Sequence, residues 1–377
     1  MTQGIIVRYE GEKLAKALQD FWKELLDRDI VRALLLPVEV EGGLVAPGLL
    51  TDSERVKESR VLSPYMPLNT ARVLQTMTRI LPPSEKMAVV LRPCELRATV
   101  ELIKLKQISL DNLILISVDC LGTYPLEEYK KIMESEDRPE DQLLEKLMQG
   151  EEDERIREAC RSCIYPVAPW ADMRIGFLGL HNEGVFLIEA LTERGEEVLS
   201  KLGMESVEVG LEGREKFLEG LTAKRKEGEQ RLFENQRENL RGSDKLLSAL
   251  SSCINCHNCM NVCPICYCKE CFFDSPTFEV EADRYLGIAK GRGAARMPAD
   301  ILLFHLTRMA HMATSCVACG MCEDACPMGV PVFQLFKAVG AKAQELFQYE
   351  PGKSLEEELP LATFREKELD TVQEPKI

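Results

Sequence analysis

The sequence lacks three features that would direct the protein to a membrane or to nucleic acid. Its first residues, MTQGIIVRYE, have no basic region followed by an apolar core, so no signal peptide is expected. No apolar run reaches the length needed to span a bilayer. The formal net charge of -15 disfavours binding to nucleic acid or to an anionic membrane surface. We therefore expect a cytoplasmic protein whose acidic side chains serve solubility and docking to partner subunits.

Cysteine, in contrast, is abundant, with 15 residues in a chain of 377. Because no signal peptide is expected, we predict that these thiols are metal ligands rather than disulfides. Two segments, SCINCHNCMNVCP and SCVACGMCEDACP, share the spacing C-x2-C-x2-C-x3-C-P, which is typical of bacterial ferredoxins. Structural zinc usually uses two C-x2-C pairs, and buried free cysteines would not repeat this pattern.

In this motif, three closely spaced thiolates surround one 4Fe-4S cluster, while the fourth thiolate reaches across to the other cluster. The first predicted cluster is held by Cys253, Cys256, Cys259 and Cys326. The second predicted cluster is held by Cys316, Cys319, Cys322 and Cys263. Pro264 and Pro327 follow the crossing ligands and end the local element, because proline cannot continue it.

The first 125 residues alternate predicted strands and helices. Strands are expected at 5–9, 31–40, 87–91 and 113–118, and helices at 14–26, 68–81 and 95–106. Gly42 and Gly43, after the second strand, could form a plain turn or cradle a phosphate. This order predicts an α/β domain with a mostly parallel sheet, joined to a dicluster ferredoxin-like domain rich in α-helix.

Two further cysteines follow expected strands: Cys94 in LRPCELRA and Cys120 in SVDCLGTYP. Open α/β sheets bind ligands at the carboxyl ends of their strands. Cys160 and Cys163 form a C-x2-C pair beyond a charged segment, 126–159, which we expect to be an exposed helical excursion that returns the chain to the same site. Two single thiols and one pair are enough for a third 4Fe-4S cluster. The alternative is two core cysteines and a zinc half-site.

These residues carry a resemblance to a known family. The segment 90–125, the pair at Cys160 and a strand pair near 175–187 resemble the beta subunits of deazaflavin (coenzyme F-420) hydrogenases and formate dehydrogenases, over roughly residues 30–200. A ferredoxin-type module is commonly attached to that domain. The resemblance implies a 4Fe-4S cluster beside FAD, a diffusible hydride carrier as redox partner, and a catalytic alpha subunit. The ligands implied for that cluster are Cys94, Cys120, Cys160 and Cys163. No short motif indicates the residues that contact FAD.

A long insertion separates the two ferredoxin-type motifs. Its first part contains Cys266, Cys268 and Cys271, to which no cluster is assigned. These thiols could line a cluster, or could form a zinc site with His257 or with a cysteine elsewhere.

The second part of the insertion predicts a helix at 298–313. We expect His305 and His311 to be capped or exposed helix residues rather than ligands. Basic residues in this region are expected to favour the reduced, more negative clusters or to contact an acidic partner; they are Arg292, Arg296 and Arg308.

The predicted domains are an α/β flavin and 4Fe-4S domain, a helical linker, a ferredoxin domain with an insertion, and an acidic tail ordered only against a partner. Their bounds are 1–200, 201–245, 246–347 and 348–377. We expect an iron-sulfur flavoprotein subunit of an anaerobic formate dehydrogenase or hydrogenase, whose substrate site lies on another chain. The alternative is a flavin-free adapter that relays electrons between a dehydrogenase and a heterodisulfide-reductase-like or quinone-linked complex. A structural metal-binding scaffold is a third alternative.

Overall fold

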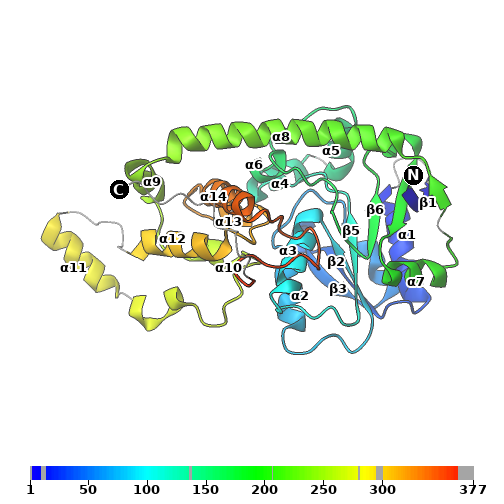
Figure 1. The fold of residues 1–377 in the computed structure, drawn as a ribbon, viewed down its shortest axis with the longest axis horizontal. Coiled ribbons are helices and arrows are strands. Elements are labelled where there is room, and N and C mark those ends of the chain that lie inside the picture. Colours follow the sequence, from blue (N-terminus) through cyan, green and yellow to red (C-terminus); the bar gives the residue numbers. More distant parts are fainter. Residues whose placement is uncertain are drawn as a thin grey trace.

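A mixed sheet of eight strands forms one part of the computed structural model, and a helical part that carries most of the cysteines adjoins it (Figure 1). The structure describes residues 2–9, 14–135, 138–205, 207–278, 281–293 and 300–363. Within these ranges, no helix combines the length and the apolar character needed to cross a membrane.

The strands lie in the order β3-β2-β4-β5-β6-β7-β1-β8. Their bounds are β1 Thr2–Arg8, β2 Ala33–Glu39, β3 Val45–Leu50, β4 Met87–Leu91, β5 Leu113–Val118, β6 Met173–Gly176, β7 Val185–Ala190 and β8 Val207–Val209. The neighbours β2, β4, β5 and β6 run parallel, whereas β3, β7, β1 and β8 join the sheet by antiparallel pairing. The predicted α/β class holds, but the mostly parallel sheet is not confirmed: the sheet has a parallel centre and antiparallel margins.

The connection between β2 and β3 explains one of these margins. The short turn η1 (Glu41–Gly43) brings Val45 opposite Glu39. A crossover between parallel strands needs a dozen or more residues, so a connection this short requires antiparallel pairing. Gly42 and Gly43 have φ angles of 82° and 72°, which glycine adopts without a Cβ clash. These glycines therefore form a hairpin turn.

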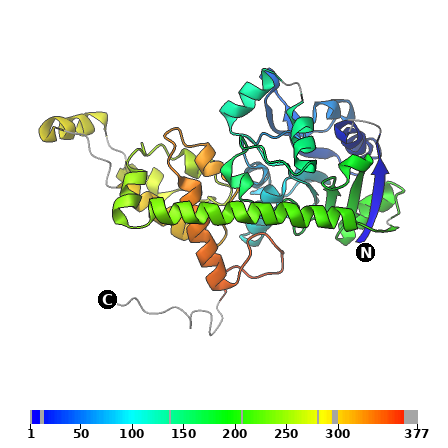
Figure 2. The same cartoon turned by 90° about the horizontal axis from the view of Figure 1, so that it is seen from above.

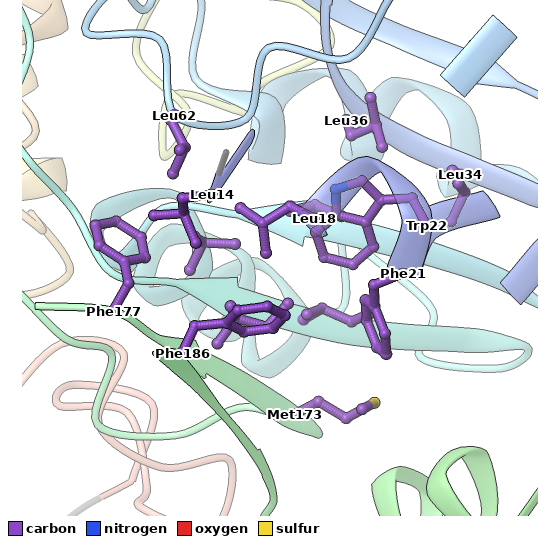
Figure 3. Close-up of a cluster of buried hydrophobic side chains, with 14 of the residues drawn as sticks. Leu14, Leu18, Phe21, Trp22, Leu34, Leu36, Leu62, Met173, Phe177 and Phe186 are labelled. Atoms are coloured by element: carbon purple, nitrogen blue, oxygen red, sulfur yellow. The ribbon is translucent and has the colours of Figure 1, made fainter. Parts of the chain in front are cut away.

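Helices cover the sheet. Their bounds are α1 Leu14–Asp27, α2 Thr70–Thr78, α3 Pro93–Lys104, α4 Leu126–Met133, α5 Pro139–Met148, α6 Glu158–Arg161 and α7 Glu193–Lys201, with short turns η2 Ser53–Glu58 and η3 His181–Glu183. Helix α1 forms because apolar residues recur at helical spacing, which places Leu18 and Trp22 on one buried face. Figure 3 shows this face in a cluster with Leu34 and Leu36 of β2 and Phe186 of β7.

The charged segment 126–159 is not an exposed excursion. Helices α4 and α5 bury Ile132, Leu143 and Leu147 in the same core as α1. The expectation was wrong because the many charged residues conceal an apolar stripe at helical spacing.

Helix α8 (Glu212–Leu240) runs along both parts of the molecule (Figures 1 and 2). Leu221 packs into the core of the sheet, and Leu232 packs with Ala159 of α6 and with Phe333 of the cysteine-rich part. The predicted helical linker is therefore a helix that packs against both parts of the chain, and we call α8 the bracing helix.

The cysteine-rich part consists of helices of 3 to 16 residues joined by loops. Their bounds are α9 Ser243–Leu250, α10 Asn258–Asn261, η4 Phe272–Asp274, η5 Pro276–Phe278, α11 Ala282–Arg292, α12 Asp300–Met312, α13 Met321–Asp324 and α14 Val332–Phe347. Helix α12 is the one predicted in the insertion. Helix α11 projects away from the other elements in both views (Figures 1 and 2).

The beginning of the predicted tail packs on α3. The hydroxyl of Tyr349 and the N–H of Gly352 both donate to the carboxylate of Glu101. Arg97 Nε donates to the carbonyl of Pro351 at 2.9 Å. This stretch is held by the chain itself, contrary to the expectation that only a partner orders it. The carboxyl-terminal end of the tail lies outside the described residues.

Candidate iron-sulfur centres

The two ferredoxin-type motifs adopt the same loop conformation. Asn255 and His257 in the first motif have φ angles of 57° and 58°, and Ala318 and Gly320 in the second have 56° and 75°. Left-handed residues at these positions curl the loop and turn backbone N–H groups toward its centre. The N–H of Asn255, for example, donates to Cys253 Sγ at 3.5 Å. The sequence repeat is therefore a repeat of backbone geometry.

Each predicted set of four ferredoxin-type cysteines lines one cavity. The first cavity is lined by Cys253, Cys256, Cys259 and Cys326. The second is lined by Cys263, Cys316, Cys319 and Cys322. In each case three thiols of one motif meet the fourth thiol of the other, which is the arrangement that the crossing of ligands requires. We call these the first and second cysteine groups.

The chemistry of both groups suits a buried metal cluster. Burial, followed by neighbouring thiols, raises the pKa of Cys319 to about 12. Burial also raises the pKa of Cys259 to about 11. Thiols bind metal as thiolates, so bound iron would displace these protons and compensate the buried charge. A backbone N–H, that of Val330, already donates to Cys326 Sγ at 3.3 Å, as is common around cluster sulfurs.

The other four predicted ligands also come together, and we call them the third cysteine group. Cys94 and Cys120 follow the parallel neighbours β4 and β5, so they share one edge of the sheet. Burial, followed by the nearby thiol of Cys120, raises the pKa of Cys94 well above its ordinary value, and Cys163 contributes in the same direction. Cys160 enters from α6, where its Sγ lies 3.5 Å from Thr123 Oγ1.

A buried ion pair anchors the backbone beside Cys120. Asp119 accepts hydrogen bonds from Arg214 Nη1 at 2.6 Å and from the N–H groups of Phe177 and Leu178, both at 2.9 Å. Arg214 comes from α8, so the bracing helix supports the third group through Asp119.

The third group adjoins the second. A Cβ on Gly320 would lie 2.3 Å from Cβ of Ala159, so the second motif presses against α6 beside Cys160. The Cys319 thiol is also among the groups that oppose ionisation of Cys94 and so help to raise its pKa. The three groups therefore form a row.

The unassigned thiols of the insertion do not converge on one point. Burial, followed by the neighbouring Cys263, raises the pKa of Cys266 to about 11. Cys268 is exposed, and Cys271 Sγ lies 3.5 Å from Met260 Sδ. Cys266 therefore lies at the edge of the second group, whereas Cys268 and Cys271 do not join it there, and the expectation that all three thiols line a cluster stays a prediction.

The zinc alternative gains no support from His257. Its two ring nitrogens lie 2.7 Å from Asp274 Oδ1 and 3.2 Å from Asn255 Oδ1, so both have partners within the chain. Across the described ranges, no three His, Cys, Asp or Glu side chains are close enough to hold a single metal ion. A cubane differs because its four ligands bind four different iron atoms.

Several side chains around these groups escaped the sequence analysis. His305, expected to be capped or exposed, is buried, and its Nε2 lies 3.5 Å from Cys253 Sγ. Arg157 lies beside the third group. Sequence spacing could have indicated that both residues lie near the cysteine groups. Arg157 comes three residues before Cys160, and His305 shares a helical face with Arg308. Arg296 lies outside the described residues.

A cavity of about 550 Å³, within the size range of ligand sites, opens at the carboxyl end of β2, on the sheet edge where Cys94 follows the parallel neighbour β4. Ser63 lines it and accepts a 2.8 Å hydrogen bond from Arg92, two residues before Cys94. Its wall also includes Trp22, whose indole N–H is fully buried and has no hydrogen-bond partner in the described part of the chain. An unpaired buried donor at a cavity wall suits a ligand with acceptor atoms.

The repeated cysteine motifs and their buried cavities define an iron-sulfur protein, and comparisons with known proteins make the class more specific. Residues 84–210 match the family model for the C terminus of the coenzyme F420 hydrogenase/dehydrogenase beta subunit, and residues 248–330 match the model "4Fe-4S dicluster domain". The chain carries a domain of this beta-subunit family joined to a 4Fe-4S dicluster domain, and the resemblance seen in the sequence is confirmed.

The chain is similar over most of its length to two curated proteins. The F420-dependent formate dehydrogenase subunit beta of Methanocaldococcus jannaschii is 28% identical over 381 residues, which cover 93% of this chain and 94% of the relative. The F420-dependent formate dehydrogenase 1 subunit beta of Methanococcus maripaludis is 28% identical, with 92% of each chain covered. Both relatives are named as beta subunits of an oxidoreductase, which agrees with the predicted class.

Proposed function

We propose that this chain is the electron-transfer beta subunit of a formate dehydrogenase complex that exchanges electrons with a deazaflavin hydride carrier. The names of the two relatives favour formate over hydrogen as the substrate of the complex. The formate site belongs to a catalytic alpha subunit on another chain. When bound, a flavin exchanges two electrons as a hydride, and 4Fe-4S clusters exchange electrons one at a time.

The observation that carries this proposal is the row formed by the three cysteine groups. Each group supplies four thiols, which is the ligand number of a 4Fe-4S cluster. The third group meets the second where Gly320 presses on Ala159, and the second shares both motifs with the first. The row leads from the sheet edge to the helical part, so the chain can hold clusters along one route.

The surrounding residues would keep this route dry and its ligands fixed. Apolar side chains, including Met312, Met321, Phe333 and Phe336, wall the second group. The Asp119–Arg214 pair fixes the backbone beside Cys120 in the third group. Rigid, desolvated surroundings favour electron transfer because little has to rearrange when a charge moves.

The 550 Å³ cavity is our candidate for the FAD site. Its position on the sheet edge that also carries Cys94 would put a flavin on the same side of the domain as the third group, and the indole N–H of Trp22 offers an unused donor. Lys57 and Arg60, at the same wall, are cations of the kind that bind phosphate. The substitution Trp22→Phe keeps most of the apolar volume and removes the donor, so we expect weaker flavin retention with unchanged iron content.

The test is to purify the full chain anaerobically, incubate it with FAD, and measure protein-bound flavin and iron. We expect about one flavin per chain, together with iron in all three groups. A chain that holds iron but no flavin would overturn the flavin assignment. The flavin-free adapter, with a heterodisulfide-reductase-like or quinone-linked partner, would then be the better account.

A further inference from the structure

Arg308 lies between the first and second cysteine groups. It belongs to α12, inside the insertion, and is only 3% exposed. Its Nη1 donates to Cys259 Sγ at 3.1 Å, and its Nη2 donates to the Cys259 carbonyl at 3.0 Å. The same side chain lines the cavity of the second group beside Cys263 and Cys322. One guanidinium therefore contacts a thiol of the first group and forms a wall of the second.

Arg157 occupies the junction between the second and third groups in a similar way. It is 7% exposed, and its Nη2 lies 3.9 Å from Cys160 Sγ of the third group. Its Nη1 lies 3.4 Å from the sulfur of Met321, which immediately precedes Cys322 of the second group. The carboxylate of Asp324, 3.7 Å away, offsets part of its charge. Each junction in the row thus contains a buried arginine that contacts a ligand thiol, and Arg97, 4% exposed and bonded to the carbonyl of Val317, is a further arginine near the second and third groups.

The polypeptide does not fully compensate these two charges. The Nε atoms of Arg157 and Arg308 are buried and have no hydrogen-bond partner within the described ranges. The side-chain group that Arg308 contacts is the thiol of Cys259, and a protonated thiol carries no negative charge. A buried guanidinium without a counter-charge is costly, so clusters held by thiolates would supply the missing negative charge.

We propose that Arg308 and Arg157 set the reduction potentials of the clusters on either side of them and allow neighbouring clusters to be reduced together. This inference rests on the three ligand sets proposed above. Each electron moves from one cluster to the next, oxidising the donor and reducing the acceptor by one unit, with no bond made or broken. The electron makes the acceptor more negative. A fixed positive charge at the junction favours that state and screens the repulsion between two reduced neighbours.

The two junctions differ in strength. Arg308 has no carboxylate partner in the described part of the chain, whereas Arg157 shares its charge with Asp324. Arg308 should therefore have the larger effect, and its effect falls on the first and second clusters. One hydride delivers two electrons. The first and second clusters could store both of them if each cluster can hold one electron at the same time.

The test is a redox titration of the full chain, followed by electron paramagnetic resonance, with iron content measured first. In Arg308→Gln, the reduction equilibria of the first and second clusters should shift toward the oxidised form by about tenfold, about 59 mV for a one-electron couple. The third cluster should not change. In Arg157→Gln, a smaller shift should appear in the second and third clusters and not in the first.

Two further variants separate charge from shape. Arg308→Lys keeps the positive charge and should shift the equilibria much less than Arg308→Gln. Arg292→Gln removes an exposed arginine on α11 and should leave all potentials unchanged. Unchanged potentials in an iron-loaded Arg308→Gln protein would overturn the proposal. If that variant does not retain iron, Arg157→Gln decides in the same way. Loss of iron in both would also overturn it, since the arginines would then serve assembly.

Discussion

The third cysteine group and the two ferredoxin-type groups each bring four thiols together, but the chain positions these thiols in different ways. In the pair, each motif curls around its own centre through two left-handed residues, such as Asn255 and His257. In the third group, Cys94 and Cys120 depend on strands of the sheet, and Cys160 arrives after a long segment. A local motif carries its own geometry, whereas the third group exists only when the whole domain is folded. Changes far from the cysteines should therefore damage the third group selectively.

The largest expected effect follows from removing a ligand of the third cluster, at the sheet edge. Cys94→Ala should nearly abolish electron exchange between the hydride carrier and the ferredoxin-type clusters, because the third group is the one that belongs to the α/β domain, which also contains the candidate flavin site. Flavin binding and direct flavin reduction should largely survive. Stopped-flow spectra measure both steps. Reduction of the ferredoxin-type clusters at the wild-type rate would show that electrons bypass the third group.

The next effect tests the crossing of ligands within the pair. Cys263→Ala should remove the second cluster, about four iron atoms, because its thiol lines the cavity with Cys316, Cys319 and Cys322. The first cluster should keep its paramagnetic signal. Cys268→Ala is the matched control, since this thiol is exposed. If Cys263→Ala leaves all signals unchanged, either Cys266 replaces it or the crossing is wrong.

A glycine pair tests the junction between the two kinds of centre. Gly320 and Gly203 have φ angles of 75° and 70°, so alanine at either position costs roughly 1 kcal/mol through the backbone. At Gly320 the new methyl group would also collide with Ala159, whereas nothing lies within 4 Å at Gly203. Gly320→Ala should therefore lower the melting temperature clearly more than Gly203→Ala, and should slow transfer between the second and third groups. Equal effects would mean that the two parts do not touch there.

The smallest effect concerns a carboxylate in the segment that leads to the third group. Arg155 holds the pKa of Asp153 below its ordinary value through hydrogen bonds, and Tyr124 also donates to this carboxylate. Asp153→Asn should cost about 1–2 kcal/mol at pH 7.

The pH dependence of this effect has a definite sign. A lowered pKa in the folded state stabilises the fold above the unfolded value of about 3.9, and this contribution is lost as the pH falls through the folded pKa. Melting curves of the wild type and of Asp153→Asn should therefore converge in acid. The exposed Asp20→Asn should show a smaller difference at pH 7. A gap between wild type and Asp153→Asn that persists in strong acid would contradict this explanation.

Much of this arrangement could be predicted because the signals are local. The spacing of the ferredoxin-type motifs fixes which thiols can meet, and buried strands such as 87–91 and 113–118 appear in the structure with the predicted bounds. Strand β3 was missed because its sequence, VAPGLL, contains proline and glycine, which argue against a strand. Its antiparallel pairing is a main reason why the sheet is mixed rather than mostly parallel.

Other features could not be predicted because they depend on contacts between distant residues. The docking of Tyr349 on Glu101 joins positions separated by 248 residues, and no pattern in the acidic tail indicates it. The position of Arg157 between two cysteine groups likewise follows from the packing of α6 against the second motif. Sequence periodicity reports which face of an element is buried, but not which distant element covers it.

The central claim is that three groups of four thiols each hold a 4Fe-4S cluster. The most direct test is the iron and acid-labile sulfide content of the full chain, expressed and purified anaerobically without its partners. We predict about twelve iron and twelve sulfide per chain, four of each for every group. A fully loaded chain with about eight of each would contradict the claim, because Cys94, Cys120, Cys160 and Cys163 would then hold no cluster.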